Sequence, residues 1–305
     1  MSAQKILFIT LSNVGDAVLT TPTLEALHQS YPNAKVDIVC DKRSAELFEY
    51  CPYLHRIFIK EKNAGLVPNL KLILALRIRY YDIAVDLRTD ILLKLIRAQR
   101  KLYKLPNHLT LSMHSAVKHF SAIREASNVP IPATKLWSSV TIDQKIHSIM
   151  LPLKGKNILA LGLGANFSGK IWPVACYIAL SDALAPYFDA VLLLGNTQEQ
   201  LFSQQFIAQS QLPTYDFCGK LTLVETYVAL KQATYFVGND SGLGHIASAA
   251  AIPTFTIFGP GSPARYLPWS KKARYYQASS QTITQIDANT IAGLIVDDLS
   301  AIKPA

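Results

Sequence analysis

The chain has 305 residues, 50% of them hydrophobic, and a formal net charge of +9. This length predicts two domains that each bury a core of their own. The longest uncharged run, residues 246–264, contains three prolines and two glycines, which excludes a lipid-exposed membrane helix.

Strand and helix patterns alternate through the first half of the chain. The sequence predicts strands at residues 5–10, 35–40, 56–60, 82–88 and 101–106. It predicts helices at residues 17–31, 42–50, 69–81, 90–98 and 116–126. We interpret the N-terminal segment as strand, turn and helix rather than as a signal peptide, because Asp16 interrupts its apolar run.

The alternation stops at residues 128–156, where a Pro-rich stretch is followed by a predicted linker, and then resumes. Strands are predicted at residues 157–164, 190–195, 215–219, 235–238 and 254–259. Helices are predicted at residues 174–188, 199–209, 223–233, 242–251 and 287–302. The pattern predicts an α/β protein with two Rossmann-like, doubly wound parallel sheets that face a central cleft.

The positive charge lies in the first half. Residues 1–150 hold 20 Lys and Arg against 12 Asp and Glu, whereas residues 151–305 hold 10 against 9. Lys94, Arg97, Lys101 and Lys104 would share one face if the helix around them continued that far. This half should attract nucleic acid, a membrane surface or a phosphorylated substrate, and the alternative is a solvated surface without a partner.

The four cysteines, Cys40, Cys51, Cys176 and Cys218, show no CxxC spacing. We interpret them as reduced core residues, which favours a cytoplasmic protein.

Three polar positions follow predicted strands. Asp16 comes directly after the first strand, where a general base could lie, although an Asp there could also be a helix N-cap. Lys170 lies in the loop "GLGANFSGKIWP" and could pair with a diphosphate, or could be an exposed lysine. Asp240 precedes the helix "SGLGHIASAAA", whose N-terminus suits phosphate.

Several motifs are missing from the sequence. It contains no DxD, no zinc spacing, no GxSxG and no GxxxxGK[ST], so we expect no metal and no cofactor. Gly162 and Gly164 form part of a dinucleotide fingerprint without its third glycine.

Four ordered segments resemble the ADP-heptose:lipopolysaccharide heptosyltransferases, which are glycosyltransferases of family 9 with the GT-B fold. They are "ILFITLSNVGDAVLTTPTLEALHQSYPNAKVDIVC", "YDIAVDLR", "KIWP" and "GNDSGLGHIASAAAIPTFTIFGPGSP". The resemblance covers nearly the whole chain. It implies an inverting transfer of heptose from ADP-heptose to an anionic, lipid-linked acceptor of the lipopolysaccharide inner core.

The resemblance also implies roles for individual residues. Asp16 matches the catalytic base, and Leu221 falls where the family lines its nucleobase pocket. The donor-binding residues would be Asn166, Lys170, Asp240, Ser241, Gly242, Leu243 and His245. The acceptor-binding residues would be Lys60, Lys62 and Arg88, in the basic half.

The expected domains are an acceptor-binding domain at 1–150, a donor-binding domain at 151–285 and a helix at 286–305 that crosses back toward the first domain. We expect a cytoplasmic enzyme held loosely at the inner face of the membrane by electrostatics.

Four alternatives remain open at this point. They are a different nucleotide-sugar donor, a non-catalytic nucleotide or lipid-head-group binding protein on the same frame, an NAD-dependent oxidoreductase, and a nucleic-acid binder. The last is the weakest, because the basic cluster contains no recognisable nucleic-acid-binding module.

Overall fold

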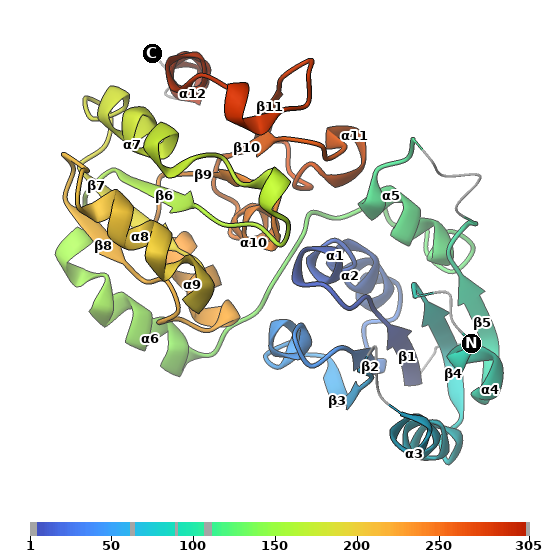
Figure 1. Ribbon diagram of the computed structural model, residues 1–305. Coiled ribbons are helices and arrows are strands. Elements are labelled where there is room, and N and C mark those ends of the chain that lie inside the picture. The colour runs from blue at the N-terminus through green and yellow to red at the C-terminus, as the bar shows by residue number, and fades with distance from the viewer. Residues whose placement is uncertain (1–4, 62–64, 89–90, 107–111, 303–305) are drawn as a thin grey trace. The chain divides into compact units, whose positions relative to one another are not determined.

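A computed structural model describes residues 5–61, 65–88, 91–106 and 112–302 of the chain (Figure 1). The chain divides into two compact units, Met1–Ser139 and Val140–Ala305. The expected boundary at residue 150 therefore lies one helix too late, because residues 140–149 belong to the second unit.

Unit 1 contains a five-stranded sheet in the order β3-β2-β1-β4-β5. Every pair of neighbouring strands is parallel. The strands are β1 (Lys5–Ile9), β2 (Lys35–Cys40), β3 (Leu54–Ile59), β4 (Tyr81–Asp86) and β5 (Ala98–Tyr103). The central strands are apolar and buried, as expected for a parallel sheet covered on both faces.

Helices cover both faces of this sheet. Its helices are α1 (Val14–Val18), α2 (Thr21–Ser30), α3 (Leu66–Arg77), α4 (Leu92–Leu95) and α5 (Ser115–Phe120), with short 3-10 turns η1 (Ala45–Phe48) and η3 (Ser121–Ile123). α3 and α4 share a core with β1 and β4, and α2 packs with α5.

The single helix predicted at residues 17–31 is wrong, because the chain forms α1 and α2 instead. The Thr20 hydroxyl donates to the carbonyl oxygen of Ala17 at 2.6 Å, and Pro22 then lies in the first turn of α2. Proline has no N–H to continue the preceding helix, so it fits a new helix start. The helix predicted at residues 42–50 is likewise reduced to η1.

The helix predicted at residues 90–98 is reduced to the short α4, and the strand predicted at residues 101–106 is present as β5, which begins earlier. α4 ends at Leu95, Ile96 is extended, and the chain continues as β5, whose Ala98 pairs with Tyr81 of β4. Pairing with the sheet therefore overrides the helical pattern. Lys101 lies within β5 and Lys104 follows it, so the four cations do not share a helix face.

Unit 2 contains a six-stranded parallel sheet in the order β11-β10-β9-β6-β7-β8. The strands are β6 (Ile158–Gly162), β7 (Ala190–Leu194), β8 (Thr214–Asp216), β9 (Tyr235–Asn239), β10 (Thr254–Phe258) and β11 (Ala273–Gln277). The sequence analysis did not predict β11, which extends the sheet at its edge.

Helices again lie on both faces. The longer ones are α6 (Val140–Ile149), α7 (Val174–Ala183), α8 (Gln200–Ile207), α9 (Leu223–Leu230), α10 (Gly242–Ala249) and α12 (Ala288–Ile302). The shorter ones are α11 (Pro263–Tyr266), η4 (Leu151–Leu153), η5 (Ser168–Lys170), η6 (Thr197–Glu199) and η7 (Ile283–Gln285). α7 packs against α8 and α12, whereas α9 packs against α6 and α10.

No helix was predicted within residues 128–156, where the structure forms α6 (Val140–Ile149) just before the predicted linker. Lys145 of α6 pairs with Glu225 of α9 at 2.5 Å, which fixes α6 within unit 2. α12 is anchored in the same unit, because Ile291, Ala292 and Ile295 join the core under α7. Its crossing toward the first domain stays a prediction.

The four cysteines are free, and all but Cys176 are buried. Burial raises the pKa of the Cys51 thiol to about 11 and, with Asp41, that of the Cys40 thiol to about 12. They are core residues, as predicted. Within the described ranges, none of the helices combines the length and the apolar content that a membrane crossing needs.

His119 of α5 is a buried ionisable group in unit 1, with 3% of its surface exposed. Its Nδ1 lies 3.3 Å from the carbonyl oxygen of Leu19. Burial lowers its pKa to about 3, and the nearby Lys104, Lys118 and His114 act in the same direction. The folded protein therefore keeps this imidazole neutral.

This burial predicts a loss of stability in mild acid. Unfolded His119 gains a proton near pH 6.5 and folded His119 does not, so stability is complete above pH 6.5 and falls toward pH 3. At pH 5 the effect is about 2 kcal/mol. Chemical denaturation at pH 7 and at pH 5 measures the free energy of unfolding. From pH 7 to pH 5 this free energy should fall by about 2 kcal/mol less in His119→Gln than in the wild type. Parallel losses in the two proteins would contradict the prediction.

Candidate active site

Asp16 lies at the carboxyl end of the central strands of unit 1. The chain leaves β1 toward β2 and leaves β4 toward β5, so the sheet order reverses between β1 and β4. Open α/β sheets bind ligands at such a switch point. Asp16 is the third residue of α1 and is half-buried. The N-cap of α1 is Asn13, so the alternative that Asp16 is the helix N-cap is wrong. The side-chain amide of Asn13 donates to Asp16 Oδ2 at 3.0 Å.

Other ionisable groups gather at the same edge. Asp86, the last residue of β4, is fully buried and accepts a hydrogen bond from the Arg88 backbone at 2.8 Å. Burial and the neighbouring Lys118 lower the pKa of Lys104, while the carboxylates of Asp86 and Asp16 act to raise it. The sequence placed Lys104 in a strand predicted at residues 101–106, but nothing in it indicated that Lys104 lies near Asp86 and Asp16.

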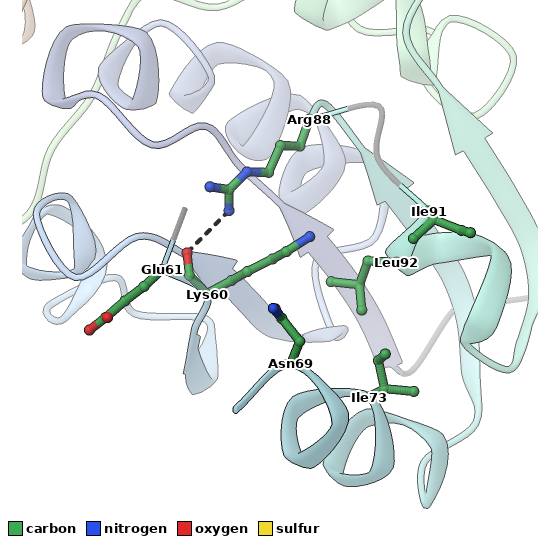
Figure 2. A pocket seen from close by; sticks show the side chains of 7 residues that line it. All are labelled: Lys60, Glu61, Asn69, Ile73, Arg88, Ile91 and Leu92. Atoms are coloured by element: carbon green, nitrogen blue, oxygen red, sulfur yellow. Dashed lines mark hydrogen bonds between the residues drawn. The ribbon is translucent and has the colours of Figure 1, made fainter. Parts of the chain in front are cut away.

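A pocket of about 430 Å³ opens in unit 1 beyond the ends of β3 and β4 (Figure 2). It is lined by Lys60, Glu61, Asn69, Ile73, Arg88, Ile91 and Leu92. The Arg88 guanidinium donates to the backbone carbonyl of Lys60 at 3.3 Å and to the Ser12 hydroxyl. Two of the three predicted acceptor residues, Lys60 and Arg88, therefore lie together. The third, Lys62, lies outside the described residues.

An ion pair joins two predicted donor residues in unit 2. Lys170 Nζ lies 2.5 Å from Asp240 Oδ2, and both side chains are mostly buried. Lys170 comes from the loop after β6 and Asp240 from the loop after β9, and these strands are neighbours at the switch point of this sheet. Gly261 packs so closely that a Cβ there would lie 2.5 Å from Asp240 Oδ2, so a larger residue would displace the Asp240 carboxylate.

A buried asparagine holds these two loops together. Asn239 is fully buried, and its amide donates to the backbone oxygens of Leu163 at 2.9 Å and Gly164 at 3.3 Å. Its carbonyl oxygen accepts from the Trp172 backbone and the Tyr177 hydroxyl, each at 3.0 Å. The sequence analysis missed Asn239. A polar residue at the end of an apolar strand, beside Asp240, was the available signal.

Trp172 fixes the segment that carries Lys170. Its ring is fully buried, meets Tyr177 edge to face at 4.9 Å, and donates from Nε1 to the carbonyl of Ile286 at 3.0 Å. The tryptophan two residues after Lys170 therefore anchors the loop in the core and leaves the lysine at the edge of the sheet.

The helix predicted after Asp240 is confirmed as α10. Ser241 is its N-cap and makes no side-chain capping bond, so Asp240 is not the cap either. Leu243 packs beside β6, because a Cβ on Gly162 would lie 2.9 Å from its Cδ2. His245 is buried within the helix, with 5% of its surface exposed. Ser241 and Gly242 are half-buried at the start of the helix, where backbone N–H groups face outward from its first turn.

The remaining predicted residues lie farther along the same edge of the sheet. Asn166 is exposed in the loop after β6, and Leu221 is half-buried in the turn after β8. β8 lies three strand spacings from β9, which is about 14 Å.

Between these positions lies Glu199 of η6, which sequence reasoning also missed. Its carboxylate accepts from the Asn196 backbone at 2.5 Å, and burial raises its pKa. A Cβ on Gly164 would lie 2.2 Å from Glu199 Oε1. Close packing against Leu243 and Glu199 thus accounts for the two glycines of the partial dinucleotide fingerprint.

No group of three His, Cys, Asp or Glu side chains suited to a metal ion occurs in the part of the chain that the structure describes.

Comparison with known proteins identifies the family. The sequence model of glycosyltransferase family 9 (heptosyltransferase) matches residues 70–294, about three quarters of the chain. The chain belongs to glycosyltransferase family 9. Lipopolysaccharide heptosyltransferase 3 of Escherichia coli is 26% identical over 285 residues, which cover 84% of each protein.

Solved structures of family 9 proteins share the fold. E. coli ADP-heptose lipopolysaccharide heptosyltransferase II superposes with a TM-score of 0.81 at 20% identity, covering 98% of this chain and 99% of that one. E. coli heptosyltransferase WaaC with ADP superposes with a TM-score of 0.78 at 18% identity, covering 97% and 100%. The expected family and the α/β fold of GT-B type, with two parallel sheets, are confirmed.

The family match makes the protein a glycosyltransferase and decides against the oxidoreductase and nucleic-acid alternatives. The roles of the individual site residues stay predictions.

Asn239 generates a prediction about the site of unit 2. Asn239→Ala leaves the buried backbone groups of Leu163, Gly164 and Trp172 without the hydrogen bonds that Asn239 makes to them. It should lower the free energy of unfolding by about 3 kcal/mol and weaken ADP binding. Tyr177→Phe removes a single hydroxyl from the same cluster and is the matched control, with an expected cost of about 1 kcal/mol. Thermal unfolding and calorimetric titration with ADP measure both effects. Equal losses in the two variants would show that Asn239 does not organise the loops.

Proposed function

We propose that this glycosyltransferase moves a heptose from ADP-heptose to the lipopolysaccharide inner core, an anionic and lipid-linked saccharide, with inversion at the anomeric carbon. The observation that carries the proposal is the edge of unit 2 where Lys170, Asp240 and the start of α10 meet. The family match and the names of the relatives support the choice of sugar.

The donor would extend along the carboxyl edge of the sheet in unit 2. Lys170 and the N–H groups at Ser241, Gly242 and Leu243 would bind the diphosphate, because a helix N-terminus and an ammonium both favour negative charge. Asp240 would accept from sugar hydroxyls, and His245 would support the helix from within. The ADP bound in the E. coli WaaC structure supports adenosine as the nucleoside.

The nucleoside would lie toward β7 and β8. Glu199 carries a carboxylate between Lys170 and the turn of Leu221, where it could accept from ribose hydroxyls. Leu221 would then pack against the adenine. Asn166 is exposed beside Lys170 and would contact the diphosphate or the sugar.

Asp16 would act as the base in unit 1. Its carboxylate takes the proton from the acceptor hydroxyl as that oxygen forms a bond to C1 of the heptose. The bond from C1 to the phosphate oxygen breaks, and ADP leaves with the electron pair. Lys170 and the N-terminus of α10 stabilise the charge that develops on the departing diphosphate.

The acceptor would bind on unit 1. Lys60 and Arg88 offer cations at the pocket of Figure 2, and Lys62 would add a third. The net positive charge of residues 1–150 would draw an anionic saccharide to this unit. We further propose that the protein is cytoplasmic and works as a peripheral enzyme on the inner face of the membrane.

The proposed base gives a first test. Asp16→Asn keeps the shape of the side chain but cannot accept a proton, so kcat should fall by about 10²- to 10⁴-fold while donor binding is retained. Glu125→Gln, which neutralises an exposed carboxylate of the same unit, is the control and should keep full activity. Turnover of Asp16→Asn at the wild-type rate would favour the non-catalytic alternative or a different base.

The donor is tested by thermal shift with ADP, UDP, GDP and NAD. Ligand that binds the native state raises the unfolding midpoint, and we expect this with ADP alone. The shift should be lost in Lys170→Gln and kept in Lys156→Gln, which alters an exposed lysine at the opposite end of β6. A shift with UDP or GDP instead would keep the reaction class and overturn the donor.

A further inference from the structure

One side of α3 is apolar and exposed. Leu66, Leu70, Leu74 and Ile78 recur every four residues and therefore follow one side of the helix, with Val67 beside them. Their exposed fractions are 89%, 57%, 54%, 84% and, for Val67, 64%. We call these five residues the α3 apolar stripe.

The stripe is not needed for the core of unit 1. Leu72 and Leu76, on the other side of α3, already join the apolar cluster formed with β1, β4 and α4. A helix that is apolar on all sides is normally buried on all sides. A contiguous exposed apolar surface of this kind marks an interaction site.

The charged residues on α3 itself are both positive. Lys71 and Arg77 are exposed on the same helix, and no acidic residue occurs between Glu61 and Asp82. Arg79, which follows the helix, is paired with Asp37 at 3.6 Å. An apolar stripe flanked by cations is complementary to an anionic lipid surface. A symmetric dimer through the stripe would instead bring two positively charged helices together.

The helix that carries the stripe also lines the pocket of unit 1. Asn69 and Ile73 of α3 line that pocket together with Ile91 and Leu92 (Figure 2). Ile91 and Leu95 of α4 are themselves exposed, at 67% and 38%. The pocket thus has charged side chains of Lys60, Arg88 and Glu61 together with the apolar side chains of Ile73, Ile91 and Leu92.

We propose that the α3 apolar stripe inserts its side chains into an anionic lipid surface, so that hydrophobic contact anchors the protein beside the pocket. This deepens the proposed function and rests on it for its purpose, because a lipid-linked acceptor is anchored in the same surface. Salt weakens electrostatic attraction, whereas inserted apolar side chains keep the protein on the membrane at high salt. Insertion can therefore be told apart from electrostatic attraction alone.

Vesicle sedimentation tests the insertion without nucleotide or acceptor. The wild type should bind vesicles of phosphatidylcholine with phosphatidylglycerol, and a clear part of this binding should survive high salt. The triple variant Leu66→Gln, Leu70→Gln, Leu74→Gln keeps helix propensity and should bind at least about tenfold more weakly. The matched control changes three exposed apolar residues of unit 2, Val140→Gln, Leu151→Gln and Leu201→Gln, and should bind as the wild type does.

Three results would overturn the proposal. They are a wild type that ignores these vesicles, a triple variant that binds them equally well, and binding abolished by salt. Analytical ultracentrifugation gives a fourth: a wild-type dimer that the triple variant dissociates, without vesicle binding, would make the stripe a contact between copies. The ADP thermal shift of the triple variant is measured in parallel. A triple variant that no longer binds vesicles but keeps the ADP thermal shift supports the proposed role of the stripe. Absence of an ADP thermal shift in the wild type would instead count against the proposed donor, whatever the vesicles show.

Discussion

The site of unit 2 depends on the side chain of Asn239. The loop after β6 carries Lys170, the loop after β9 carries Asp240, and no regular secondary structure joins the two. Asn239 supplies the link, because its amide satisfies two carbonyls of the first loop and its oxygen accepts from Trp172 and Tyr177. In a fully buried position each of these groups would otherwise be costly, so the network specifies one loop arrangement.

The sequence predicted most of the parallel strands because their signal is local. Short apolar runs bounded by polar turns identify β1, β2, β6, β7, β9 and β10 without reference to any partner. The positions of Asp16, Lys170 and Asp240 followed from those strands, since loops after parallel strands share one edge of a sheet. The motifs around them were long enough to identify the family as well.

What the sequence did not predict depends on contacts between distant segments. The helix predicted at residues 90–98 gives way before Ala98, because β4 offers hydrogen bonds that begin β5 there. α6 follows a Pro-rich stretch and is held by Lys145 on Glu225, a pair 80 residues apart. The roles of Glu199 and Asn239 depend on the backbones that they approach, and no spacing in the sequence encodes those.

The ion pair between Lys170 and Asp240 has a consequence for product release. The ammonium of Lys170 is already paired with the carboxylate of Asp240, 2.5 Å away. An anion that binds Lys170 must therefore share this cation with Asp240 and is repelled by the Asp240 charge. Free phosphate obtains little from such an exchange. A ligand that also offers hydroxyl donors to Asp240 relieves the repulsion. In the proposed reaction, departure of the sugar would end that relief, and the carboxylate would then compete with the diphosphate for Lys170.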